Sequence, residues 1–435
     1  MIAPPETLPA ARKRRLAREP ERASFAVELE TTTPIYGGSA TSRRVDAVDF
    51  IRPASVRGQL RFWWRAAVGH GYDAPGRLLE EEAALFGTAA GEVDEGASGR
   101  SSVIVRIKPE PKTFRFADYQ DFEGAAYALW AARAQSRGEP AAEVRAPGAR
   151  FQLEVSAPAA SIGALETAVR CWIAFGGYGG RTRRGCGALT VRAERENWLP
   201  ATPRWAELAW GVPPTEPKRL TDLPLLAGAR AAVGRTERDG LAAFQVAAGW
   251  LRDFRQGPGS GPMSAREPGE RNRPGRSRWP EADKVRRLLR GRWSHEPRHD
   301  AEPAWPRAGF GLPIIGQFQR RARDGGRLQE PGDFELRWRD AKGKSHDRLA
   351  SPLIVKPLAL ADGRFVPLAL WLHRGWPAGG RPLLVRPEEL KDSAAPFDRL
   401  LGKHDEPLFA PLAAGTLREA FLQWLAARGV HEVQP

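Results

Sequence analysis

Apolar and polar residues alternate in several short segments near the start of the chain, and this period predicts strands. The segments are residues 25–32, 103–107, 151–155 and 188–192. Two further segments have apolar residues at helical spacing, about 55–68 and 162–175, and Ser55 is a suitable N-cap for the first. The resulting order is βαββαβ, which is the ferredoxin-like unit. An additional helical stretch is expected at about 122–136, between the second and third strands.

The second half has a less regular pattern. Residues 198–235 are rich in Pro, Trp and Gly and indicate an irregular connection, and a helix is expected over 240–256. Two apolar runs, 351–360 and 364–372, flank Asp362-Gly363, a strong hairpin signal weakened by Pro357 and Pro367. A closing helix is expected over 416–428, whereas the Pro/Gly/Arg-rich segment near 257–280 predicts a mobile, low-complexity insertion.

The charge balance points to a polyanionic partner. The 435 residues contain 67 Lys and Arg against 52 Asp and Glu, which gives a net charge of +15. Such an excess favours nucleic acid or an anionic surface as the partner. The basic N-terminal segment, residues 1–22, is expected to be a disordered arm, and the insertion near 257–280 is a second basic segment that could contact RNA or only serve as a tether.

The two cysteines, Cys171 and Cys186, belong to no CxxC pair, so a zinc site or a disulfide framework is not expected and a reducing cytoplasm fits. No apolar run approaches the ~20 residues of a membrane span, so no membrane partner is expected.

The segment Gly176-Gly-Tyr-Gly-Gly-Arg-Thr-Arg-Arg-Gly-Cys-Gly187 is the strongest candidate site, and we call it the glycine loop. Its six glycines leave backbone amides open to close approach, and Arg181, Arg183 and Arg184 add guanidinium groups that bind phosphate bidentately. The loop lacks the Lys-Ser/Thr ending of a Walker A loop, and it follows a predicted helix instead of opening one, unlike the dinucleotide motif. It therefore suits the backbone of RNA.

The helix beginning near residue 55 is the second candidate. Between residues 50 and 70 it carries four arginines and no acidic residue, and Arg57, Arg61 and Arg65 lie along one stripe. A stripe of like charge is unfavourable unless a polyanion binds to it. Ser55 and the first-turn amides would add an anion site at the helix N-terminus. Trp63 and Trp64 are expected in the core, with base stacking as the less favoured interpretation.

Catalytic chemistry finds little support in the sequence. Metal-independent RNA cleavage needs a general acid and a general base, and the glycine loop contains no histidine. His70 is expected to interact with the end of its helix, and Asp46 to form an Asx-turn or a cap, as Asp49 would. The His295/His299 spacing imitates a metal site, but Pro297 prevents regular helical presentation. No catalytic residue, metal or cofactor is predicted.

Three segments, read in order, resemble the RAMP superfamily of CRISPR proteins. They are Thr-Thr-Pro-Ile-Tyr-Gly-Gly at 32–38, Ile-Arg-Pro-Ala-Ser-Val-Arg-Gly-Gln-Leu-Arg-Phe-Trp-Trp-Arg at 51–65, and the glycine loop. More narrowly, they are similar to the first RAMP subunit of the type III-B effector, the Cmr complex. Trp279–Asp283, Phe310–Pro313 and Arg348–Pro352 resemble later motifs of that subunit. Cys186 departs from the pattern, because an aromatic residue is commoner in such loops.

The resemblance implies an α+β fold with two ferredoxin-like (RRM-like) domains, antiparallel sheets and insertions, over residues 23–197 and 198–435. It implies a non-catalytic subunit that holds the 3′ part of the guide RNA beside other RAMP subunits, with target RNA as a further candidate ligand. A metal-independent RAMP endoribonuclease and a generic RNA-binding protein remain alternatives. The RNA-binding residues carried over are Gly37, Gly38, Arg52, Ser55, Arg57, Arg61, Arg65, Gly177, Gly179, Gly180, Arg181, Arg183, Arg184 and Gly185.

Overall fold

A computed structural model describes residues 21–41, 43–88, 99–134, 138–217, 222–257, 277–297, 305–322, 324–377, 379–386, 390–391 and 415–434. The predicted basic arm and insertion lie almost entirely outside the described residues, as do His299 and Asp300.

The first half forms the predicted ferredoxin-like unit. Its strands are β1 (Arg22–Thr31), β3 (Ile104–Pro109), β6 (Arg150–Pro158) and β7 (Leu189–Val191), joined by α1 (Pro53–Val68) and α3 (Ile162–Phe175). The sheet order is β3-β6-β1-β7, and every pairing is antiparallel. In order of appearance this is second-third-first-fourth, the arrangement of a βαββαβ unit. The predicted fold class is therefore confirmed for this half.

The second half repeats the same topology. Its elements are β8 (Leu225–Val233), α6 (Gly240–Gln256), β12 (Leu353–Ala359), β13 (Phe365–His373), α8 (Leu417–Ala426) and β16 (His431–Glu432). The sheet order β12-β13-β8-β16 is again second-third-first-fourth and antiparallel. The predicted hairpin around Asp362-Gly363 is β12–β13, and Pro357 lies opposite Pro367 within it.

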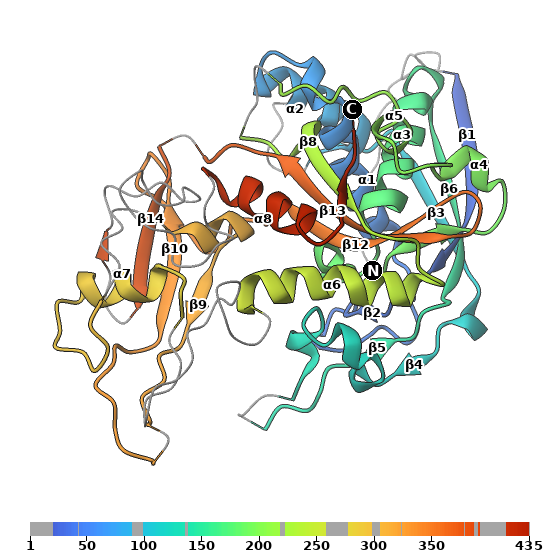
Figure 1. Ribbon diagram of the computed structural model, residues 1–435. Coiled ribbons are helices and arrows are strands. Elements are labelled where there is room, and N and C mark those ends of the chain that lie inside the picture. The colour runs from blue at the N-terminus through green and yellow to red at the C-terminus, as the bar shows by residue number, and fades with distance from the viewer. Residues whose placement is uncertain are drawn as a thin grey trace, which may run out of the picture.

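The two units stack in four layers, as Figure 1 shows. The first sheet covers one side of α1 and α3, and the second sheet packs on their other side, since Val56, Trp172, Leu225 and Leu368 belong to one apolar cluster. Helices α6 and α8 cover the remaining face of the second sheet, where Phe254 and Phe421 lie with ring centroids 5.1 Å apart. The units therefore share a core.

Smaller elements surround these layers. A three-stranded sheet contains β2 (Ile35–Tyr36), β5 (Val144–Arg145) and β4 (Phe116–Ala117). The short helices are η1 (Gly69–Gly71), α2 (Pro75–Phe86), η2 (Pro111–Thr113), η3 (Tyr119–Ala125), η4 (Trp130–Ala132), η5 (Ala159–Ser161), η6 (Thr182–Arg184), α4 (Arg195–Trp198) and α5 (Trp205–Leu208).

A third sheet, at the left of Figure 1, is inserted into the second unit. It contains β9 (Ile314–Gly316), β10 (Phe334–Arg339), β11 (Ser345–His346), β14 (Arg381–Arg386) and β15 (Leu390–Lys391), together with α7 (Glu281–Leu288) and η7 (Pro306–Phe310). Two of the three later motifs meet beside it, where Leu312 and Leu349 exchange backbone hydrogen bonds. Glu281 of the other motif pairs with Arg307, just before Phe310.

Three local predictions were wrong. Ser55 is not the N-cap of α1: Arg52 occupies that position because Pro53 opens the helix, so Ser55 lies exposed in the first turn. The expected helix at about 122–136 is two short 3-10 helices in its described part, with a kink at Phe122. The stretch predicted to be irregular, 198–235, contains the buried strand β8, whose run of small residues lacks alternation.

Candidate nucleic-acid interface

The glycine loop lies between α3 and β7, where the two ferredoxin-like units meet. Several of its amides bond within the chain: Gly180 donates to the Tyr36 carbonyl at 2.6 Å and Gly187 to the Pro34 carbonyl at 2.9 Å. The Tyr178 amide donates to the Gly187 carbonyl at 2.9 Å. These bonds lay the loop along residues 34–38, so the first and third resembling segments are neighbours.

Close packing accounts for part of the glycine content. At Gly187, which has a φ of +62°, a Cβ atom would stand 1.9 Å from the Tyr178 carbonyl oxygen. At Gly185, with a φ of +87°, it would stand 2.7 Å from the Phe244 ring of α6. Gly177 is also pressed against the backbone of Gly187. These positions need glycine whether or not a ligand binds.

Arg52 joins the N-terminus of α1 to this place. Its amide donates to the Tyr178 hydroxyl at 3.0 Å, and its guanidinium donates to the Gly38 carbonyl. Gly37 has a φ of +66° with open space where a Cβ would be. The structure thus brings together Gly37, Gly38, Arg52, Gly179 and Gly180, which come from three distant segments.

The loop arginines turn toward the protein. Arg181 donates to the Ala128 carbonyl at 2.8 Å, and Arg183 donates to the Ser351 carbonyl of the second unit. The Arg183 guanidinium also lies over the Phe62 ring, 5.3 Å from its centroid. Burial lowers the pKa of Arg183 to about 10. In this structure these two side chains bond to carbonyls of neighbouring elements, and their contact with phosphate stays a prediction.

Arg184 is different, since its Nη1 atom is buried and has no hydrogen-bond partner among the residues that the structure describes. Burial, followed by the positive charge of Arg255, lowers the pKa of Arg184 to about 9. Arg181 and Arg183 act in the same direction. Among the described residues, this end of the loop therefore has an excess of positive charge.

The arginine stripe on α1 is only partly free. The Arg61 guanidinium pairs with the buried carboxylate of Glu82 on α2, and Arg65 lies 3.3 Å from the same carboxylate. The neighbouring helix α2 thus supplies the acidic residue that α1 lacks. The repulsion between the α1 arginines is therefore no evidence by itself that a polyanion binds there. Arg57 is exposed, and no described residue forms an ion pair with it.

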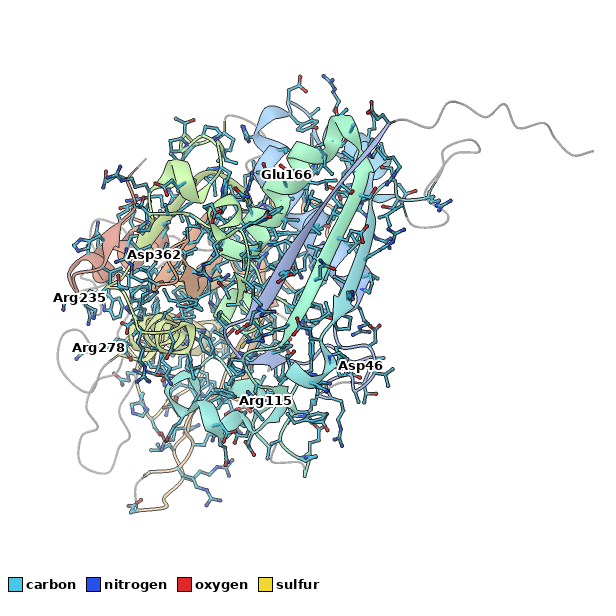
Figure 2. All side chains as sticks on the ribbon, turned by 90° about the vertical axis from the view of Figure 1, so that its right-hand side faces the viewer. Asp46, Arg115, Glu166, Arg235, Arg278 and Asp362 are labelled. Atoms are coloured by element: carbon cyan, nitrogen blue, oxygen red, sulfur yellow. The ribbon has the colours of Figure 1, made fainter. Side chains whose placement is uncertain are left out.

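Figure 2 looks onto the open face of the first sheet, which is the face that RRM proteins use for stacking bases. Here the outward positions of β1, β3 and β6 carry no aromatic residue. They hold ion pairs across the strands, such as Arg106 with Glu154 at 3.0 Å and Arg150 with Glu30 at 2.8 Å. Paired charges and small side chains give this face no stacking platform.

The residues weighed for catalysis have structural partners. His70 Nδ1 lies 2.8 Å from the Ala67 carbonyl at the end of α1, and Asp46 accepts from the amides of Val48 and Asp49. These amide bonds lower the pKa of Asp46. His295 lies 2.5 Å from the Glu330 carboxylate. Within the described ranges no group of three potential metal ligands occurs, and no helix is long and apolar enough to cross a membrane.

Comparison with known protein families gives a match to residues 28–190, the segment that contains all the candidate RNA-binding residues. This segment matches the model of the RAMP superfamily. Residues 28–190 are therefore similar to a RAMP domain. The matched segment runs from within β1 to within β7, so the glycine loop and α1 lie inside it.

A curated relative also matches part of the chain. CRISPR system Cmr subunit Cmr1-1 from Pyrococcus furiosus is 27% identical over 175 residues, which are 39% of this chain and 48% of that protein. The chain thus matches about half the length of this curated relative.

Two solved structures are similar at low scores. The apo crystal structure of Cmr1 from Pyrococcus furiosus has a TM-score of 0.49 and 14% identity, and covers 94% of this chain and 98% of that one. A chain of the type III-B Cmr-beta complex bound to cognate target RNA has a TM-score of 0.43 and 9% identity, with 81% and 95% covered.

Sequence reasoning missed three residues that shape this region. The Tyr178 hydroxyl accepts a hydrogen bond from the Arg52 amide, and Glu82 pairs with Arg61 of the α1 stripe. The charge of Arg255 acts on Arg184. The acidic positions of α2 could have suggested Glu82, because its helix follows α1 directly. No sequence signal links Arg255 to the loop.

Proposed function

We propose that the chain is a non-catalytic RNA-binding subunit of a type III-B CRISPR ribonucleoprotein, which holds guide RNA and contacts other RAMP subunits. The observation that carries the proposal is the convergence of Gly37, Gly38 and Arg52 with the glycine loop inside the segment that matches the RAMP superfamily. The relative from Pyrococcus furiosus is a CRISPR system Cmr subunit, which supports membership of a Cmr complex. The 3′ part of the guide is the portion that the family resemblance implies.

The RNA surface proposed here is the side of α1 and the loop at 37–41, not the open sheet. Arg57 and Ser55 are exposed in the first two turns of α1, beside Arg52. Helix N-termini and guanidinium groups both favour phosphates. The opposite sheet face is occupied by ion pairs and lacks aromatic residues.

Copurification tests the proposal. The tagged chain, expressed together with its CRISPR locus, is expected to retain guide RNA and RAMP subunits after washing at moderate salt. Sequencing the bound RNA identifies guide sequences, and mass spectrometry identifies the proteins. Arg57→Ala with Ser55→Ala should reduce the retained RNA, whereas Arg106→Ala on the open sheet should not. Recovery of random cellular RNA and no RAMP subunit would refute the proposal in favour of a generic RNA-binding protein.

The endoribonuclease alternative has a direct test as well. The purified chain is incubated with CRISPR repeat RNA in the presence of a chelator. We expect no site-specific cut, because His70 is engaged with the end of its own helix. A specific cut that His70→Ala abolishes would replace the binding-subunit proposal with the endoribonuclease.

A further inference from the structure

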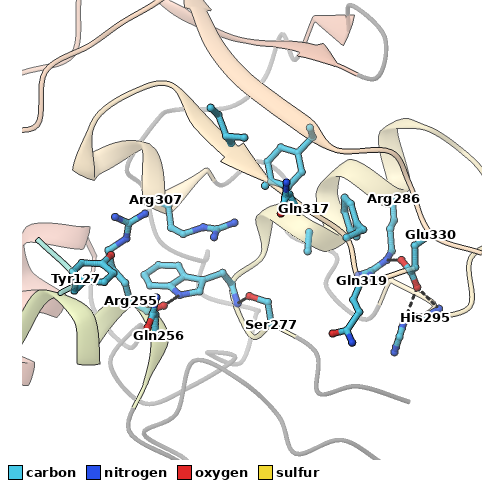
Figure 3. A pocket seen from close by; sticks show the side chains of 16 residues that line it. Tyr127, Arg255, Gln256, Ser277, Arg286, His295, Arg307, Gln317, Gln319 and Glu330 are labelled. Carbon is cyan, nitrogen blue, oxygen red and sulfur yellow. Dashed lines mark hydrogen bonds and ion pairs between the residues drawn. The ribbon is translucent and has the colours of Figure 1, made fainter. Parts of the chain in front are cut away.

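A polar cavity of about 360 Å³ lies between the end of α6 and the inserted third sheet. Figure 3 shows two distinct ends. Tyr127, Arg255 and Arg307 stand at one end, and Arg286, His295 and Glu330 at the other. A volume of this size is at the lower limit of small-molecule sites in proteins.

At the end formed by Arg286, His295 and Glu330, the charged side chains pair with one another. The Glu330 carboxylate accepts from Arg286 Nε at 2.8 Å and lies 2.5 Å from His295 Nδ1. A second carboxylate, that of Asp283, lies 2.8 Å from Arg286 Nη1. These groups satisfy one another and fix the wall, so they leave little net charge for a ligand.

The near end has unbalanced positive charge. Arg307 is neutralised by the buried carboxylate of Glu281, 3.1 Å away, but no ion pair to Arg255 occurs among the described residues. The Arg255 guanidinium lies over Phe310, 5.5 Å from the ring centroid. Arg184 of the glycine loop lies outside the cavity lining but close enough to feel the charge of Arg255, and its buried Nη1 has no partner among the described residues. Within the described part of the chain, the Arg255 guanidinium therefore has no counter-ion.

The cavity walls add groups that suit a nucleoside. Trp279 and Phe318 contribute aromatic rings, and Gln317 and Gln319 contribute amides. The Trp279 indole donates to the Arg255 carbonyl at 2.9 Å, so this ring is fixed in place against α6. Rings and amides are the groups that proteins use to bind unpaired bases.

We propose that this cavity binds one nucleotide, with its phosphate at the Arg255–Tyr127 end and its base toward Trp279 and the two glutamines. The phosphate supplies a counter-ion to Arg255, and charge-assisted bonds to guanidinium are among the stronger protein–ligand bonds. The inference rests on the proposed RNA-binding function. It adds a site lined mostly by the second unit, with Tyr127 contributed by the first.

The test uses the full chain and two sources of the same chemistry, adenosine 5′-monophosphate (AMP) and a uridine octamer. Arg255→Met removes the charge but keeps the stem over Phe310, and Tyr127→Phe removes one hydroxyl. The matched control is Arg252→Met, one turn earlier on α6, where the exposed guanidinium pairs with Asp253 at 2.7 Å. Calorimetry measures AMP binding, fluorescence anisotropy measures octamer binding, and thermal denaturation verifies folding.

We expect the wild-type chain and Arg252→Met to bind AMP alike, and Arg255→Met to bind it about tenfold more weakly. AMP should also displace the octamer. Equal AMP affinity in Arg255→Met and wild type, with both folded, would overturn the inference. So would inorganic phosphate that competes as well as AMP, since it would indicate a general anion site.

The outcomes separate this inference from the proposed function. A wild-type chain that binds the octamer at an affinity that Arg255→Met leaves unchanged, and that AMP does not displace, would retain the proposed function and remove the cavity site. A chain that binds AMP through Arg255 but binds no RNA would refute the proposed function and identify the cavity as a site for free nucleotide.

Discussion

The two ferredoxin-like sheets have the same strand order but different surroundings. In the first sheet, β1 alternates between buried and exposed positions, and its outer face meets solvent. In the second sheet, all seven residues of β12 are buried, including Lys356, because helices cover both faces. Topology thus does not determine which face of a sheet is exposed. The elements packed against the sheet do, since helices cover both faces of the second sheet but only one face of the first.

The largest effect is expected at Lys356, the buried cation of the covered sheet. Its Nζ donates to the Ile173 carbonyl of α3 at 2.8 Å, and burial lowers the pKa of Lys356 to about 7. The unfolded chain therefore binds more protons between pH 7 and 10.5, so stability rises with pH in this window. The contribution is roughly 1.4 kcal/mol for each pH unit.

Lys356→Met removes this titration and keeps the volume. Chemical denaturation at several pH values should show that the variant lacks the wild-type gain in stability above pH 7. Arg183 and Arg184 are present in both proteins, so the difference isolates Lys356. Parallel stability curves for the two proteins would show that Lys356 is not buried as a neutral amine, and the contrast between the sheets would weaken.

The second largest effect is expected at Gly187, in the glycine loop where the two units meet. Gly187→Ala places a methyl group against the Tyr178 carbonyl at a positive φ, and should destabilise the fold by about 3 kcal/mol or more. Gly37→Ala is the matched control, since its φ is also positive but its surroundings are open, and should cost about 1 kcal/mol. Urea denaturation measures both. Equal losses would mean that the loop is not packed as described.

The third effect tests the helix layer between the sheets. Arg61→Ala leaves the buried Glu82 carboxylate with Arg65 alone, and should destabilise the chain by about 2 kcal/mol. Adding Glu82→Gln should recover most of the loss, because the buried charge is then removed. Thermal denaturation of the single and double variants gives the comparison. A double variant as unstable as Arg61→Ala would assign the loss to packing.

The smallest effect compares the two surfaces directly. Arg57→Ala should weaken RNA binding about fivefold and reduce the salt dependence by about one phosphate contact. Arg106→Ala, on the open sheet, should leave both unchanged because its guanidinium is paired with Glu154. Anisotropy titrations over a salt series measure the slope. A reversed result would place the RNA on the sheet face.

The alternation of β1 and β6 could be predicted because one face of their sheet meets solvent. Strand β8 could not, since an element buried on both sides has no period to detect. The end of α1 and the whole of α6 followed from helical spacing, while the first residue of α1 did not, because Pro53 outweighed Ser55.

The candidate site also has residues that could be predicted from the sequence and residues that could not. The glycine loop and Arg52 could be recognised from local composition, and the structure brings them together. The Arg61–Glu82 pair and the Arg184–Arg255 neighbourhood depend on contacts between distant elements, which composition does not encode. The roles of the candidate residues in RNA binding stay predictions, as does the domain boundary at 197/198.

The apolar layer around α1 and α3 has a consequence for how the chain comes apart. Both sheets bury their inner faces on the same two helices, so neither half can leave without exposing the other. Heat or denaturant should therefore unfold the molecule in one cooperative step. A fragment ending at residue 197 would expose the apolar face of α1 and α3 to water. Inside a larger assembly such a body would dock as a rigid block, with any adaptation left to its loops.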